Sequence, residues 1–164
     1  MKPNLAIATT CLLIALPAMA QSPAPPTQEF VNKVAVSDMF EIQSSRLALA
    51  EKPDKDTKPF AQRMVKDHQK TTAELKKLVD SGKVQAKLPT ALDSDHQNML
   101  DELKAKTGKE FDQSYDQIQV KAHQDAVALF EAYAKDGDNA DLKKWAASTL
   151  PHLKQHLAMA QKLK

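Results

Sequence analysis

Two imidazoles one helical turn apart mark the segment of this chain that is best suited to chemistry. His152 and His156 lie in the sequence LPHLKQH (150–156), within a stretch that is otherwise rich in apolar residues. Residues four apart on an α-helix stand almost above one another, so their side chains can share one partner. Neutral imidazole is a common ligand of transition metals, and this segment is therefore a candidate part of a metal site.

Other polar residues fall on apolar faces when side chains are placed at 100° per residue. His68 lies in an arc that includes Met64, Glu41 lies on the apolar strip of its own helix, and His123 lies beside such a strip. A carboxylate with several neutral imidazoles suits zinc, iron, manganese or copper. The predicted metal ligands are Glu41, His68, His123 and His156, with His152 in second rank because it lies nearer the rim.

Two methionines bear on the identity of the metal. Met64 precedes His68 by one turn, and Met159 follows His156 by three residues. A thioether beside imidazole favours copper, whereas methionine at helical spacing also serves as core filler. A second interpretation needs no metal, because buried histidine and glutamate side chains can hydrogen-bond one another. The sequence leaves these alternatives open.

The pattern of apolar residues predicts helices that would position these side chains. Four long amphipathic helices are expected at about 28–52, 57–80, 110–135 and 140–163, and a short one at 93–106. The intervening segments carry Pro53, Gly82, Gly108 and the turn sequence 136–139. No alternating pattern indicates a strand. The predicted fold is all-α, an up-down four-helix bundle with a short additional crossing helix.

The first twenty residues have the pattern of a signal peptide. Lys2 precedes an apolar run over 5–16, and a small-x-small sequence ends at Ala20. The run is shorter than the roughly 20 apolar residues that span a bilayer. We therefore predict a signal peptide at 1–20, cleavage after Ala20, a proline-rich tether at 21–27, a helical domain at 28–164, and location in the periplasm. Peripheral association with the envelope stays open.

Composition excludes several classes of function. The only cysteine among 164 residues is Cys11, so cleavage after Ala20 would leave no thiol for disulfides, metal binding or nucleophilic catalysis. The formal net charge of +2, with both signs interspersed, gives no footprint for nucleic acid. No glycine-rich phosphate loop and no serine in a strand-turn-helix context occurs, and we identify no catalytic residue.

Four segments, in order, carry a resemblance to a known family. They are SDMFEI (37–42), FAQRMVKDH (60–68), FDQSY (111–115) followed by His123, and LPHLKQH (150–156). The chain resembles domain-of-unknown-function family 4142, a group of secreted bacterial proteins, over 30–163. The resemblance implies a ferritin-like helical bundle and export, and it supplies no activity.

The wider ferritin-like group holds two metals with Glu-x-x-His pairs, and this chain departs from that pattern. The residues three positions before His68, His123, His152 and His156 are valine, valine, threonine and leucine. The leading hypothesis is therefore a non-enzymatic binding or envelope-stress protein with a His/Glu metal site. The alternative is a structural or interaction module, and a third is a metal-dependent oxidoreductase, which needs an open coordination position.

Overall fold

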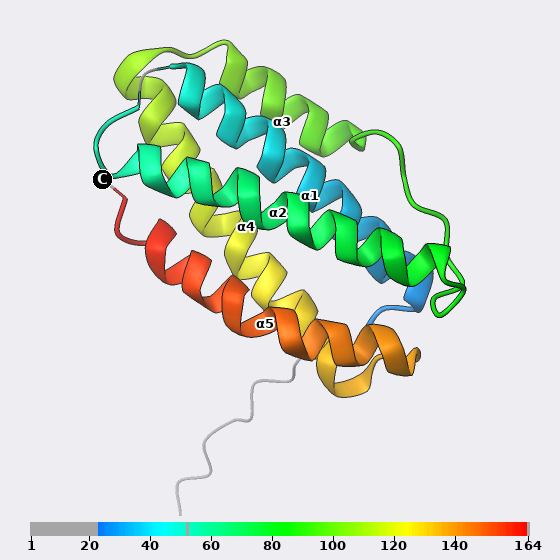
Figure 1. Cartoon of the computed structure of the whole chain (residues 1–164). Coiled ribbons are helices and arrows are strands. Elements are labelled where there is room, and N and C mark those ends of the chain that lie inside the picture. The colour runs from blue at the N-terminus through cyan, green and yellow to red at the C-terminus, as the bar shows by residue number, and fades with distance from the viewer. Residues whose placement is uncertain (1–22, 52, 164) are drawn as a thin grey trace, which may run out of the picture.

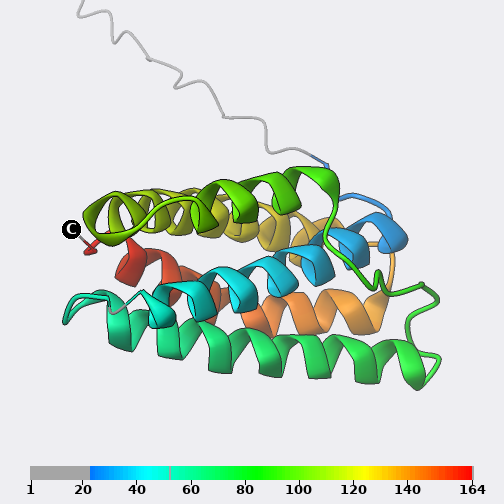
Figure 2. The same cartoon turned by 90° about the horizontal axis from the view of Figure 1, so that it is seen from above.

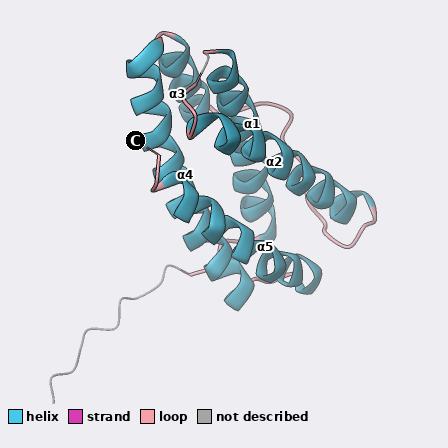
Figure 3. Cartoon of the chain, turned by 60° about the vertical axis from the view of Figure 1, so that its left-hand side comes forward, coloured by secondary structure: helices cyan, strands magenta, loops and turns pink. Residues whose placement is uncertain are grey.

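All regular secondary structure in the described part of the chain is α-helical. A computed structural model describes residues 23–51 and 53–163, which contain five helices and no strand (Figures 1 and 3). The helices are α1 (Thr27–Ala50), α2 (Thr57–Asp80), α3 (Ser94–Lys104), α4 (Gly108–Asp136) and α5 (Ala140–Ala160). The all-α prediction is confirmed. The predicted signal peptide at 1–20 lies outside the described residues, within which no helix has the length and apolar character needed to cross a membrane.

The long helices form two antiparallel pairs. Helix α1 packs mainly against α2, and α4 packs mainly against α5. The segment 81–93 and α3 return the chain along the length of the molecule, so α4 runs in the same direction as α2 (Figure 1). Helix α3 contacts α1 and α4 and lies lengthwise beside them rather than across the long helices (Figure 2). The connection between the two pairs is therefore the long one.

Two apolar clusters occupy opposite parts of the interior. In one cluster the rings of Phe30 and Tyr133 stack with 4.0 Å between their centroids. The other cluster contains Phe60, Phe111 and Tyr115, all buried. Burying a large apolar side chain contributes about 1.5–3 kcal/mol. These clusters therefore supply much of the driving force that brings the two helix pairs together.

A polar layer lies between the apolar clusters. Along α1, buried apolar residues within 30–35 are followed by the buried polar residues Asp38, Glu41, Ser44 and Ser45 and then by Ala48 of the second cluster. The buried polar side chains are Asp38, Glu41, Ser44, Ser45, Thr57, His68, Asp116, Gln119, His123, Thr149 and His156. Buried polar groups cost free energy unless they are paired. This layer is where the fold departs from what stability alone would favour.

The start of α1 differs from the sequence prediction. The predicted tether ends at residue 27, but Thr27 is the first helical residue and Pro26 occupies the N-cap position. The Thr27 hydroxyl lies 2.7 Å from the Tyr133 hydroxyl and donates a hydrogen bond to Asp138 Oδ1 at 2.6 Å. Thr27 therefore ties the start of α1 to the end of α4.

Candidate metal centre

Three histidines from three helices meet in the polar layer. His68 on α2, His123 on α4 and His156 on α5 each offer a ring nitrogen, and these three atoms lie within 4.8 Å of one another. The ring centroids are 5.4–5.7 Å apart. Each residue is at most 4% exposed. The structure thus brings together three of the five residues predicted from the sequence.

Hydrogen bonds hold the outer side of two of these rings. His123 Nδ1 lies 2.9 Å from the Gln119 carbonyl oxygen, which can only accept, so Nδ1 carries the proton and Nε2 has the lone pair. His68 Nδ1 lies 2.7 Å from Asp38 Oδ1 and donates to that carboxylate, so the lone pair of the neutral ring is on Nε2. Thr72 donates to the other oxygen of Asp38 at 3.1 Å. Both rings are therefore fixed in tautomer and orientation.

The third ring is held in the same manner through its other nitrogen. His156 Nε2 donates to Asp67 Oδ2 at 2.9 Å, and Arg63 Nε donates to the same oxygen at 3.1 Å. This leaves the Nδ1 lone pair of His156 free to face the other two rings. Metal-binding histidines almost always have such an outer partner on the second nitrogen. The three histidines thus match a ligand set in both position and tautomer.

The second ring nitrogen of each of these histidines, here called the inner nitrogen, has no hydrogen-bond partner in the described part of the protein. His68 Nε2, His123 Nε2 and His156 Nδ1 are buried and have no hydrogen-bond partner among the described residues. A buried acceptor without a partner costs about 1–3 kcal/mol. Three such atoms within 4.8 Å of one another form a place where one cation could satisfy all of them.

The protonation states of two of the three rings favour metal binding. Burial lowers the pKa of His123, and burial together with the neighbouring imidazoles lowers the pKa of His156 to about 4. Burial also opposes the protonation of His68, but the hydrogen bond and charge of Asp38 outweigh it and raise the pKa of that ring. His123 and His156 are therefore neutral at neutral pH, as a metal ligand must be.

Glu41 adds a carboxylate beside the three rings. This residue of α1 is 1% exposed, and neither carboxylate oxygen has a hydrogen-bond partner in the described chain. Its negative charge favours the protonated form of both His68 and His123, although burial outweighs it at His123 and lowers the pKa of that ring. It does not belong to the set of ligand atoms within 4.8 Å of one another. Glu41, predicted as a ligand, is thus outside the ligand set that the structure brings together.

His152 and the methionines lie differently from the sequence prediction. His152 is exposed and is not one of the clustered histidines, because α5 turns His156 and Leu153 inward. The sulfur of Met159 accepts a hydrogen bond from Arg63 Nη1 at 3.4 Å, and Met64 packs in an apolar cluster. These contacts give no support to a copper preference based on thioether ligands.

Sequence reasoning missed two carboxylates that hold the histidines. Asp38 precedes Glu41 by three residues on the same face of α1, and that spacing was the available signal. Asp67 directly precedes His68 and so lies off the stripe of that residue, and its position on α2 alone gave no signal for its role. It faces α5 and accepts the hydrogen bond from His156.

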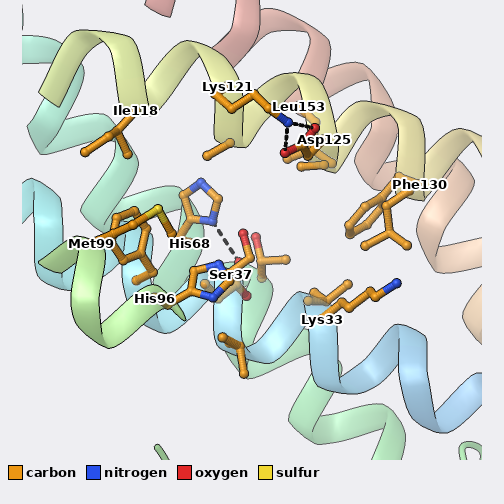
Figure 4. Close-up of a pocket in the computed structure, with 18 of the residues that line it drawn as sticks. Lys33, Ser37, His68, His96, Met99, Ile118, Lys121, Asp125, Phe130 and Leu153 are labelled. Atoms are coloured by element: carbon orange, nitrogen blue, oxygen red, sulfur yellow. Dashed lines mark hydrogen bonds and ion pairs between the residues drawn. The ribbon is translucent and has the colours of Figure 1, made fainter. Parts of the chain in front are cut away.

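A cavity of about 610 Å³ lies next to this site, between α1, α3 and α4 (Figure 4). Most of its surface is apolar, with Met99, Ile118 and Phe130 among the lining residues, but Lys121 and Asp125 also line it. His68 and Asp38 line its inner part. The cavity therefore reaches the outer, hydrogen-bonded side of one ring of the centre.

A further buried carboxylate lies two turns before His123 on α4. Asp116 is 8% exposed, and both of its oxygens lack a hydrogen-bond partner within the described residues. Burial, and then the charges of Asp54 and Asp112, raise the pKa of Asp116 to about 6. The unfolded chain ionises this group near pH 3.8. The folded protein holds the proton of Asp116 more tightly than the unfolded chain does. The resulting contribution to the free energy of unfolding is therefore fully present below pH 3.8 and is lost as pH rises through about 6.

Asp116→Asn should therefore stabilise the protein at neutral pH. The pKa difference corresponds to at most about 3 kcal/mol, and screening by nearby solvent reduces the expected gain in free energy of unfolding to about 1–2 kcal/mol. The gain should shrink to a few tenths of a kcal/mol near pH 4, where both forms are largely neutral. Urea unfolding of both proteins at the two pH values measures it. An equal gain in the free energy of unfolding at both pH values would show that the charge of Asp116 is not responsible.

Comparison with known proteins gives one result. No curated protein and no solved structure matches the chain. The family described as "Domain of unknown function (DUF4142)" matches residues 15–163, which is most of the sequence and includes every residue of the centre. The match confirms the resemblance seen in the four sequence segments. The chain belongs to this family of unknown function.

Proposed function

We propose that this protein binds one divalent transition-metal ion with His68, His123 and His156. The observation that carries the proposal is the set of three unpartnered ring nitrogens within 4.8 Å of one another, each on a ring fixed from outside. Neutral imidazoles with a nearby carboxylate suit zinc, copper or iron. Zinc is the first candidate, because it takes nitrogen and oxygen ligands without a redox partner.

The alternative of a purely structural role has less support. That hypothesis requires the buried histidines and Glu41 to satisfy one another by hydrogen bonds. Among the described residues, the inner ring nitrogens and the Glu41 oxygens form no such bond. Leaving these acceptors unpaired would destabilise the fold, since each costs about 1–3 kcal/mol. A bound cation would remove that cost.

The ligand set supports a binding protein rather than an enzyme with two metals. Two-metal carboxylate centres use carboxylates from several helices, whereas the ligand set here consists of three imidazoles, with the carboxylate of Glu41 outside it. The parallel run of α2 and α4 supports a ferritin-like arrangement of the four long helices. The pattern at residues 1–20 supports export to the periplasm. We therefore propose an exported metal-binding or stress-protection protein.

Metal analysis and chelation test this function. The protein, purified without an affinity tag or added metal, should contain about one transition-metal ion per chain by elemental analysis. Removing the ion with a chelator should lower the melting temperature, because a ligand that binds only the folded state stabilises it by RT ln(1 + [L]/Kd). Adding back Zn²⁺ should restore it, and adding Mg²⁺, which prefers oxygen ligands, should not.

Two results together would contradict the proposal. They are the absence of a transition metal from the purified protein and the failure of the chelator-treated protein to bind added Zn²⁺. An unchanged melting temperature throughout would then favour the structural role.

A further inference from the structure

A strip of buried polar side chains on α4 leads away from the metal centre. Asp116, Gln119 and His123 are spaced i, i+3, i+7 and so share one helix face. At 1.5 Å per residue the strip is about 10 Å long. Gln119 is fully buried, and within the described chain neither its side-chain oxygen nor its nitrogen has a hydrogen-bond partner.

Helix α1 contributes to the same strip. The hydroxyls of Ser45 and Tyr115 lie 2.8 Å apart, and this contact fixes the register of α1 against the antiparallel α4. Glu41 lies one turn before Ser45, so it is level with Gln119, one turn after Tyr115. Burial and then the charge of Glu41 raise the pKa of Tyr115 well above its usual value, as this placement requires.

The outer end of the strip is acidic. Asp54, in the turn between α1 and α2, is exposed, and Asp112 on α4 is half-buried. The negative charges of these two carboxylates add to the effect of burial in raising the pKa of Asp116, which is itself buried. Burial therefore increases step by step from Asp54 to Gln119. Neighbouring charges of one sign attract counter-ions and raise their association rates.

We propose that Asp116, Gln119 and Glu41 form the route by which a divalent cation reaches the three histidines from this acidic end. The inference rests on the proposed metal-binding function. Carboxylate and amide oxygens can replace water around a cation as it moves inward. Along this route the oxygens of all three side chains are buried and unpartnered within the described residues. A transient ion would give each of them a partner.

The cavity beside α3 is the competing route. It reaches Asp38 and His68 and has Asp93, Lys121 and Asp125 in its wall. Most of its surface is nevertheless apolar, and Asp38 is already hydrogen-bonded to His68 and Thr72. Its wall includes Ala126, where a larger side chain would narrow it. The two routes thus make different predictions for single substitutions.

The rate of Zn²⁺ uptake by the metal-free full chain tests this inference. Stopped-flow mixing with Zn²⁺ and a chromophoric indicator gives the rate, and equilibrium titration gives the number of ions bound. Asp116→Asn and Gln119→Leu should each slow uptake by about tenfold, with one ion still bound per chain at equilibrium. Asp136→Asn removes the same charge at the exposed far end of α4 and should change the rate less than twofold. Ala126→Phe should leave it unchanged.

The outcomes separate the route from the site. Uptake at the wild-type rate by Asp116→Asn would overturn the route, as would slow uptake by Ala126→Phe alone. Failure of the wild-type chain to bind Zn²⁺ would overturn the metal centre itself. Should Gln119→Leu unfold, Asp116→Asn decides the question, because that variant is expected to be more stable than the wild type.

Discussion

The double variant His68→Ala/His156→Ala should lose stoichiometric Zn²⁺ binding. It removes two of the three ring nitrogens that face one another, and the remaining imidazole of His123 would hold an ion no better than an ordinary surface histidine. Loss of an outer partner alone typically lowers metal affinity 10–100-fold, so the affinity should fall by more than about 100-fold. Equilibrium dialysis with elemental analysis measures this.

The chain supplies a matched control for this experiment. His96→Ala/His152→Ala also removes two imidazoles, but His152 is exposed and His96 lies on α3 against Phe40. This control should bind one ion with wild-type affinity. Metal retained by the His68/His156 variant, or lost from the control, would place the binding site elsewhere in the protein.

Glu41→Met should change stability and metal affinity in opposite directions. The substitution replaces a buried carboxylate, without a partner in the described chain, by an apolar side chain of similar length. The free energy of unfolding of the metal-free protein should rise by about 1–3 kcal/mol. Affinity for Zn²⁺ should fall by at least about tenfold, as for loss of a metal-orienting group. A residue kept only for packing would not have both effects.

Urea unfolding of chelator-treated protein and titration with Zn²⁺ measure these two effects. Glu41→Gln serves as the conservative variant, since it removes the charge and keeps the size. It should lower the affinity for Zn²⁺ while giving a smaller gain in stability, because an unpaired amide stays buried. A loss of stability in metal-free Glu41→Met would show that the carboxylate has a stabilising partner in the folded chain.

Helical periodicity was sufficient to predict much of the fold and part of the site. The five helices lie within a few residues of the predicted ranges, since proline, glycine and the turn at 136–139 mark their ends. Placing side chains at 100° per residue also turned His68 and His156 inward, as observed, and placed His123 beside an apolar strip, whereas the structure buries it. A polar residue in the middle of an apolar arc has no other direction in which to point.

The apolar periodicity within one helix could not predict which of its residues contact another helix. Asp67 lies off the stripe of His68, but α5 passes close enough for His156 to reach it. His152 lies one turn from His156, yet the rotation of α5 leaves it exposed. The partner of each ring depends on helix register and packing, which the pattern within one helix does not contain.

Because the three histidines lie on separate helices, an ion bound to them would constrain the folded chain as a whole. Asp67 and its partner His156 are 89 residues apart in sequence, and the centre spans both helix pairs. A metal ion bound there would cross-link distant parts of the chain, much as a disulfide does, in a sequence whose only cysteine is Cys11. Unlike a disulfide, this cross-link could be withdrawn by a stronger chelator. The lifetime of the protein among proteases would then follow the local supply of metal.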